Sequence, residues 1–135
     1  MLLQNGRHVP LNAGRKNWGL GGDMIFVTGP AYAGKQEYIC SELGLSDEEF
    51  TRCGIRNVER LVADNEDIEA LAEKLGKYDI VIMNETGCGI IPADAEERKN
   101  REKAGRLSCL LAKRADTVIR VVCSLPQILK GEVNK

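Results

Sequence analysis

Residues 24–36 constrain the fold of this chain more than any other stretch. Residues 25–28, Ile-Phe-Val-Thr, are apolar or β-favouring and predict a short buried strand. The next eight residues, 29–36, match the phosphate-loop pattern G-x-x-x-x-G-K-[ST] at every fixed position except the last. Because the pattern follows a strand and opens a helical segment, it stands in the context where such loops bind phosphate.

Each part of this loop has a predicted role. Gly29 lets the chain leave the strand in a conformation closed to other residues, and Gly34 lets the backbone approach an anion. The N–H groups between them would converge on a phosphate at the N-terminus of the next helix. The residues predicted to bind a nucleotide here are Gly29, Pro30, Ala31, Tyr32, Ala33, Gly34, Lys35 and Gln36. A purely structural strand–turn–helix is the alternative.

Two residues of the loop bear on catalysis. Lys35 is predicted to reach the terminal phosphates of the nucleotide and to act as a catalytic residue. Gln36 stands where a Ser or Thr would offer its hydroxyl to Mg²⁺. Its amide oxygen could replace that hydroxyl, but the side chain is longer and the ligand poorer. Nucleotide binding should survive this change more easily than catalysis.

Composition excludes several classes of protein. A chain of 135 residues with 43% apolar and 29% charged residues is typical of one globular domain. The net charge of −1 gives no electrostatic reason to expect nucleic acid or acidic membranes as partners. No apolar run is long enough to span a membrane, and no export signal is visible. Five cysteines without a C-x-x-C pair favour reduced thiols in the cytoplasm and no zinc site.

The first 23 residues differ from the rest. Several glycines interrupt them and no apolar periodicity is present, so we expect a disordered tail followed by one nucleotide-binding domain over residues 24–135. Residues 21–23, Gly-Gly-Asp, can be encoded as a ribosome-binding sequence directly before Met24. The true start could therefore be Met24, which the intact mass of the natively expressed protein would decide.

The remaining chain alternates between helix and strand patterns. A capping box of Ser46 and Glu49 predicts the start of a second helix, and either Asp64 or Asn65 is expected to cap a third. Residues 53–63 are ambiguous between a loop with a short strand and a short helix. Helices are predicted over 35–43, about 47–52, about 66–75 and 94–115, and strands over 80–83 and 117–123. This order predicts a three-layer α/β fold with a mostly parallel sheet.

Charged residues later in the chain supply further candidates. Glu85 follows the apolar run 80–83, and ligands bind at the carboxyl ends of the strands in open parallel sheets. We therefore predict a catalytic Glu85 near Mg²⁺ or a bound water, with a solvent-facing carboxylate as the alternative. Asp79, at the other end of that strand, is expected to be structural. Arg98 and Arg101 share a helix face that could contact phosphates, including those of a neighbouring subunit.

Three motifs together resemble a known family. They are the loop at 29–36, the run Asn-Glu-Thr-Gly-Cys-Gly-Ile-Ile-Pro at 84–92, and the pattern R-x-x-R-x-x-x-G-R at 98–106. In this combination the chain resembles the adenosylcobinamide kinase / adenosylcobinamide-phosphate guanylyltransferase family of cobalamin biosynthesis. The resemblance implies a P-loop fold, a strand ending near Lys130 and homo-oligomers. It also implies phosphorylation of the aminopropanol hydroxyl of a corrinoid by GTP or ATP with Mg²⁺, followed by transfer of GMP.

The chain departs from this family at three places. Family members carry a histidine in the middle segment that accepts GMP, whereas residues 37–79 contain none and His8 precedes the loop. Gln36 replaces the Mg²⁺-binding hydroxyl, and Ser108 stands where the family commonly has Asn. We therefore expect a kinase without covalent guanylyltransferase activity. A nucleotide-binding or regulatory protein that has lost catalysis, and a phosphotransferase for another small substrate, are the alternatives.

Overall fold

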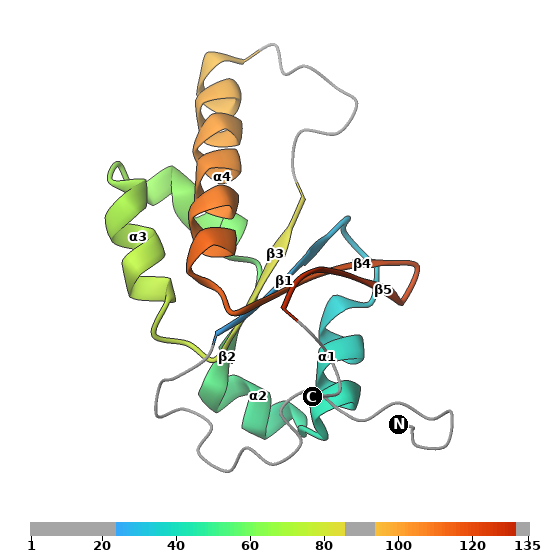
Figure 1. Cartoon of the computed structure of the whole chain (residues 1–135). Helices are drawn as coiled ribbons and strands as arrows, with labels where there is room; N and C mark the ends of the chain where they lie inside the picture. The colour runs from blue at the N-terminus through green and yellow to red at the C-terminus, as the bar shows by residue number, and fades with distance from the viewer. Residues whose placement is uncertain (1–23, 86–93, 132–135) are drawn as a thin grey trace.

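The computed structural model describes residues 24–85 and 94–131 (Figure 1). The predicted tail at 1–23, with His8, and most of the 84–92 motif lie outside these ranges. No helix within them is long and apolar enough to cross a membrane. The elements are, in chain order, β1 (Ile25–Gly29), α1 (Lys35–Leu43), α2 (Asp47–Cys53), β2 (Gly54–Ile55), the 3-10 helix η1 (Val58–Asp64), α3 (Ile68–Leu75), β3 (Ile80–Asn84), α4 (Ala95–Arg114), β4 (Thr117–Val122) and β5 (Leu125–Lys130).

The five strands form one sheet in the order β2-β3-β1-β4-β5. The first four are parallel, and β5 runs antiparallel to β4 at the edge. The register places Gly29 of β1 opposite Asn84 of β3, and Thr28 opposite Arg120 of β4. The prediction of an α/β fold with a mostly parallel sheet is confirmed.

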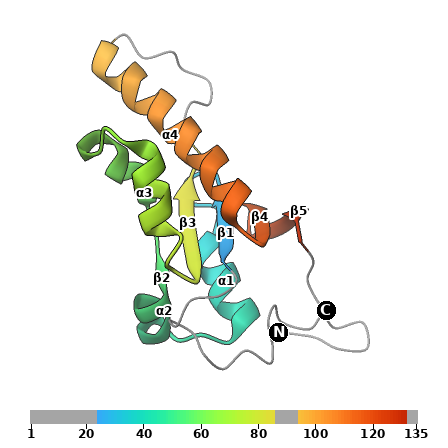
Figure 2. The same cartoon turned by 60° about the vertical axis from the view of Figure 1, so that its left-hand side comes forward.

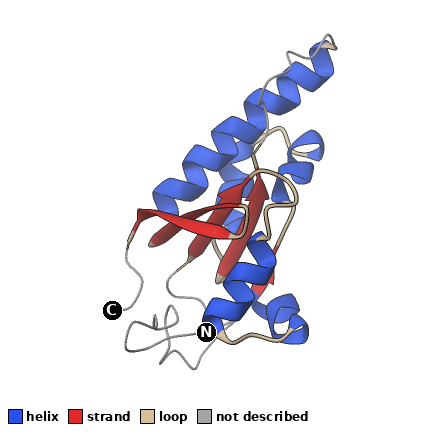
Figure 3. Cartoon of the chain, turned by 90° about the vertical axis from the view of Figure 1, so that its right-hand side faces the viewer, coloured by secondary structure: helices blue, strands red, loops and turns tan. Residues whose placement is uncertain are grey.

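Helices cover both faces of this sheet (Figures 2 and 3). Side chains alternate along β1, so that Phe26 joins the core beneath η1, α3 and α4, while Val27 joins the core beneath α1 and α2. Met83 of β3 lies in the first core and Ile82 in the second. Both cores consist of almost fully buried apolar residues. The central strands are therefore buried on both faces, as their continuous apolar runs indicate.

Local signals predicted several boundaries correctly. The helix predicted at 35–43 is α1, and the strand predicted at 80–83 is β3 with Asn84 added. The capping box before α2 is present: Ser46 N–H donates to Glu49 Oε1 at 2.8 Å, and Glu49 N–H donates to Ser46 Oγ at 3.2 Å. Both bonds satisfy amides that the helix itself leaves unpaired.

The prediction for the start of α3 is wrong. The N-cap is Asp67, whose Oδ1 accepts from Ala70 N–H at 3.1 Å, so the helix begins two residues later than expected. Asn65 does not cap α3, because its side chain donates to the carbonyl oxygen of Leu61 at 2.7 Å and closes η1 instead. The ambiguous segment 53–63 contains the short strand β2 and most of η1.

A tight hairpin joins β4 to β5. Its two connecting residues, Cys123 and Ser124, both have positive φ, 53° and 63°, as in the turns whose twist matches that of adjacent strands. The N–H of Ser124 donates to the carbonyl oxygen of Ala33 at 2.8 Å. The hairpin turn therefore lies against the loop of residues 29–36, hereafter the glycine loop. The last strand ends at Lys130, as the family resemblance implied.

Candidate functional site

The glycine loop lies at a point where two adjacent strands send the chain to opposite faces of the sheet. β1 continues through the loop into α1 on one face, whereas β3 is followed by α4 on the other. Ligands of open α/β sheets bind outside the carboxyl ends of strands at such a position. The N–H of Glu85 donates to the carbonyl oxygen of Gly29 at 2.8 Å, which joins the two strand ends directly.

The two glycines of the loop adopt conformations that few other residues tolerate. Gly29 has a φ of 147°, and a Cβ there would collide with the carbonyl oxygen of Val121 on β4. Gly34 is the N-cap of α1 with a φ of 83°, and a Cβ there would lie 2.7 Å from Ser124 Oγ. Close packing against β4 and the hairpin turn therefore explains why positions 29 and 34 need a residue without a side chain. A backbone that approaches an anion would require the same.

The middle of the loop projects outward. Tyr32 has a φ of 61°, and its side chain is fully exposed. Ala31 is also exposed, whereas Ala33 is buried. Positive φ in a non-glycine residue is strained, and such strain persists only where the surroundings determine the backbone. Here the bond from the Ser124 N–H to the Ala33 carbonyl oxygen fixes the returning side of the loop.

Lys35 turns back over the loop. Its Nζ donates to the carbonyl oxygen of Pro30 at 2.6 Å, and the residue is 6% exposed. Burial lowers the pKa of the Lys35 ammonium, while the carboxylates of Glu59 and Glu85 act in the opposite direction. The lysine thus bonds to the loop while its charge interacts with carboxylates from other elements.

Glu85 makes a two-pronged ion pair with Arg120. Arg120 Nε donates to Glu85 Oε2 at 2.5 Å, and Arg120 Nη2 donates to Glu85 Oε1 at 2.9 Å. Arg120 lies near the end of β4, so its side chain reaches across β1 to the residue that follows β3. The hydrogen bonds from Arg120 hold the pKa of the Glu85 carboxyl below its usual range, against a weaker opposing effect of burial. Sequence reasoning selected Glu85 and missed Arg120.

Glu59 is a second acidic group that sequence reasoning missed. From η1, its Oε1 accepts the backbone N–H of Asn84 and its Oε2 accepts the side-chain amide of Asn84, both at 3.0 Å. The same amide donates to Asn57 Oδ1 at 3.3 Å. These bonds fix Glu59 at the carboxyl end of β3, close enough to Lys35 to influence its pKa. The only sequence signal was the Asn84 that begins the 84–92 motif.

The structure does not bring all predicted residues together. Gln36 is held by the residue that follows β2, because its Oε1 accepts from Arg56 Nη1 at 2.7 Å. Arg98 and Arg101 lie in the first turns of α4, which extend beyond the sheet (Figures 1 and 3). Asp79 lies at the opposite end of β3, where its backbone accepts from Ile25 N–H at 2.8 Å and donates to Cys53.

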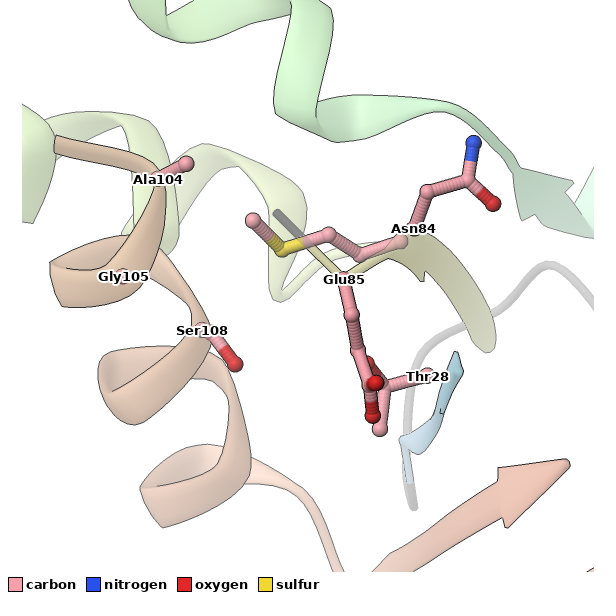
Figure 4. Close-up of a pocket in the computed structure, with 7 residues that line it drawn as sticks. Thr28, Asn84, Glu85, Ala104, Gly105 and Ser108 are labelled. Atoms are coloured by element: carbon pink, nitrogen blue, oxygen red, sulfur yellow. The ribbon is translucent and has the colours of Figure 1, made fainter. Parts of the chain in front are cut away.

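A pocket of about 140 Å³ lies beside Glu85, between α4 and the ends of β1 and β3 (Figure 4). Thr28 and Met83 line it from the sheet, and Ser108 extends from α4 toward Glu85. The described residues that line it are Thr28, Met83, Asn84, Glu85, Ala104, Gly105 and Ser108.

Within the described ranges, no group of three or more His, Cys, Asp or Glu residues is placed to hold a metal ion. Magnesium at phosphoryl-transfer sites needs fewer protein ligands, because one or two carboxylates and the substrate phosphates suffice. A carboxylate oxygen has two lone pairs, and each Glu85 oxygen uses one of them to accept a hydrogen bond from Arg120. Glu85 therefore fits an Mg²⁺ ion that is bound mainly by phosphate and water.

Comparison with known proteins indicates the same family as the three sequence motifs. The bifunctional adenosylcobalamin biosynthesis protein CobP of Pseudomonas aeruginosa is 40% identical over 67 residues, which cover 47% of this chain and 39% of CobP. The chain thus matches well under half the length of that curated relative. The family model described as cobinamide kinase / cobinamide phosphate guanyltransferase matches residues 45–129, which include Glu59, Glu85 and Arg120 but not the glycine loop. Since this match extends over more than half of the sequence, the chain belongs to the cobinamide kinase / cobinamide phosphate guanyltransferase family.

Proposed function

We propose that this protein is a nucleotide-dependent kinase that phosphorylates the aminopropanol hydroxyl of a cobinamide in cobalamin biosynthesis or salvage. The observation that carries the proposal is the convergence of Lys35, Glu59 and Glu85 at the carboxyl ends of β1 and β3: Lys35 bonds to the loop after β1, Glu85 bonds to the end of β1, and Glu59 bonds to the end of β3. A cation, carboxylates and a glycine loop at one strand edge are the parts that phosphoryl transfer uses, because that reaction needs positioning and charge neutralisation.

The glycine loop would hold the phosphates of GTP or ATP. Its N–H groups at the start of α1 offer partial positive charge, and Lys35 would exchange its bond to the Pro30 carbonyl for one to a phosphate oxygen. In the reaction the acceptor hydroxyl oxygen bonds to the γ-phosphorus. The bond from that phosphorus to the β,γ-bridging oxygen breaks, the nucleoside diphosphate leaves with its electron pair, and the hydroxyl proton passes to Glu85 or to water.

Glu85 is the residue proposed to hold Mg²⁺, and contact through a bound water suits it best because Arg120 already occupies a lone pair on each carboxylate oxygen. Magnesium would neutralise charge on the phosphates. Gln36 is the weaker candidate, since its amide oxygen accepts from Arg56. Arg98 and Arg101, at the far end of α4, would contact phosphates of a neighbouring subunit in a cytoplasmic homo-oligomer.

Covalent transfer of GMP is not part of the proposal. The sequence contains one histidine, His8, which precedes the glycine loop and lies outside the described residues. The middle segment of this chain therefore offers no imidazole that could accept a nucleotide. The proposed activity stops at the phosphorylated corrinoid.

One observation favours a second candidate, a nucleotide-binding or regulatory protein that has lost catalysis. Gln36 replaces the hydroxyl that would bind Mg²⁺, and its oxygen is paired with Arg56. Such a protein would bind a nucleotide and turn it over at no measurable rate. A phosphotransferase for another small acceptor is the third candidate.

Turnover and binding separate these candidates. GTP and ATP consumption would be measured with Mg²⁺ in the presence and absence of cobinamide, and binding would be measured by titration calorimetry. Cobinamide-dependent turnover supports the kinase, tight binding without turnover supports the second candidate, and turnover only with another acceptor supports the third. In each case Lys35→Ala should weaken nucleotide binding, whereas Lys77→Ala, an exposed lysine after α3, should not. Unchanged nucleotide affinity in Lys35→Ala would refute the role of the glycine loop.

A further inference from the structure

The pocket between α4 and the strand ends is too small for most of the molecules that a nucleotide-dependent kinase binds. Its volume is about 140 Å³. A cavity of roughly 150 Å³ accommodates a molecule the size of benzene, whereas pockets for whole drug-sized ligands start at about 300 Å³. A nucleoside or a corrin ring would not fit. A short branch of about five non-hydrogen atoms would.

The lining matches a branch that is apolar along its length and polar at its end. Met83 and Ala104 are almost fully buried and supply apolar surface, and Gly105 adds no side chain. At the polar side, Ser108 extends from α4 toward the Glu85 carboxylate (Figure 4). Both Glu85 oxygens accept hydrogen bonds from Arg120, so the carboxylate presents acceptor atoms on this side of the pocket. A carboxylate oxygen has two lone pairs, so a donor such as a hydroxyl suits this side of the pocket.

The position of the pocket also fits an acceptor. Glu85 lines it, and the Glu85 N–H donates to the carbonyl oxygen of Gly29 at the start of the glycine loop, so the pocket adjoins the loop that would hold the γ-phosphate. A hydroxyl held against Glu85 would therefore face that phosphate. Phosphoryl transfer requires such an arrangement, because the hydroxyl oxygen and the γ-phosphorus must come within about 3–3.5 Å of each other before they react.

We infer that this pocket is the specificity site for the acceptor's short hydroxyl-bearing aliphatic arm, which enters between Ser108 and Met83 and donates its hydroxyl proton to a hydrogen bond with Glu85. The inference rests on the proposed function for the identity of the arm, which is aminopropanol in cobinamide. The ring that carries the arm stays outside the pocket. Ser108 then acts as a specificity residue, and Glu85 touches the reacting hydroxyl.

The test compares two corrinoids, cobinamide and cobyric acid, which has the same ring without the arm. Ser108→Leu fills the pocket, which has room for the added atoms, and leucine favours the helix. Ser108→Ala removes only the hydroxyl. Cys109→Leu is the matched control, because it places the same side chain at the adjacent exposed position of α4. Corrinoid affinity is measured by absorbance titration and GTP affinity by calorimetry on the full chain, with circular dichroism to check folding.

We expect the wild type and Cys109→Leu to bind cobinamide more tightly than cobyric acid. Ser108→Leu should weaken cobinamide binding about tenfold or more, equivalent to ~1.4 kcal/mol, and leave cobyric acid and GTP binding unchanged. Ser108→Ala should show a smaller loss for cobinamide alone. Equal loss of GTP affinity, or cobinamide affinity that Ser108→Leu does not change, overturns the inference.

Failure of the kinase proposal is a separate result. If the wild type transfers no phosphate to cobinamide but prefers it to cobyric acid, and Ser108→Leu abolishes that preference, the pocket is supported and the kinase is not. If the wild type phosphorylates cobinamide and Ser108→Leu does so with an unchanged KM, the kinase is supported and the pocket is refuted.

Discussion

Replacing Arg120 by alanine is the sharpest test of how the candidate site is held together. The change removes both hydrogen bonds to Glu85 and leaves that carboxylate, with a side-chain exposure of 22%, without its guanidinium partner. It also removes the link from β4 across β1 to the end of β3. We expect lower stability and a change in the titration of Glu85.

The magnitude follows from exposure. A fully exposed ion pair contributes about 0–1 kcal/mol, whereas breaking a fully buried one costs about 3–5 kcal/mol. With exposures of 38% for the Arg120 side chain and 22% for Glu85, the pair lies between these limits, and solvent screening discounts it toward the lower one. We expect Arg120→Ala to reduce the free energy of unfolding by about 1–2 kcal/mol and Tm by roughly 4–10 °C.

The effect has a defined pH dependence. The pKa of Glu85 is lower in the folded protein than its ordinary value of 4.5, so between the two pKa values the unfolded chain binds more protons. The stability contributed by the pair is therefore fully present above about pH 4.5 and is lost as pH falls through the lowered pKa. The difference between the wild type and Arg120→Ala should shrink over that interval.

Urea denaturation followed by circular dichroism at several pH values between about 3 and 7 measures this difference. Arg106→Ala is the matched control, because its pair with Glu69 spans 3.7 Å with both side chains more than 60% exposed and should change the free energy of unfolding by under ~0.5 kcal/mol. Equal effects of the two variants, or an Arg120→Ala effect that grows on acidification, would refute the reasoning.

Three further predictions concern the rest of the chain. Gly29→Ala should lower the free energy of unfolding by about 2 kcal/mol or more, because Gly29 has a φ of 147° and an added Cβ would collide with the backbone of β4. Gly44→Ala has open space around the added Cβ and should lower it by only about 1 kcal/mol. Equal losses for the two variants in urea denaturation would contradict this difference. Burial raises the pKa of the Cys40 thiol to about 11, so iodoacetamide at pH 8 should alkylate the exposed Cys109 before Cys40, and peptide mass spectrometry that finds Cys40 modified as fast as Cys109 would contradict this. Ser46→Ala should cost about 1 kcal/mol through loss of the capping box, and a thermal melt identical to that of the wild type would contradict that value.

Sequence reasoning succeeded where the deciding interactions are local. The capping box of Ser46 and Glu49 spans four consecutive residues, and its two bonds are present at the start of α2. The strand β3 was equally predictable, because a strand buried on both faces is a continuous apolar run without polar positions. The start of α3 was not readable, since Asp64, Asn65 and Asp67 are all suitable caps by residue type. The continuation of η1 to Asp64 decided between them.

The candidate site depends on contacts that no local pattern contains. Glu59 reaches Asn84 across 25 positions, and Arg120 reaches Glu85 across 35. Both contacts follow from the strand order, which places β1 between β3 and β4 and brings η1 to the end of β3. Sequence reasoning selected Lys35 and Glu85, whose positions relative to a strand end follow from their places in the chain. It missed Glu59 and Arg120, which only the strand order of the sheet brings to the site.

These additions change the electrostatic character of the site. Lys35 alone would make it cationic, but with Arg120, Glu59 and Glu85 the formal charges balance. A nucleoside triphosphate brings several negative charges, so the loop N–H groups would attract it and the carboxylates would repel it. Two changes would restore attraction: Mg²⁺ arriving with the phosphates, or Arg120 leaving Glu85 for a phosphate oxygen. Mg²⁺ held through water at the other lone pairs of Glu85 would repel the Arg120 guanidinium and so favour its release toward the phosphates. The bidentate pair is thus a reason to expect nucleotide and magnesium to bind together.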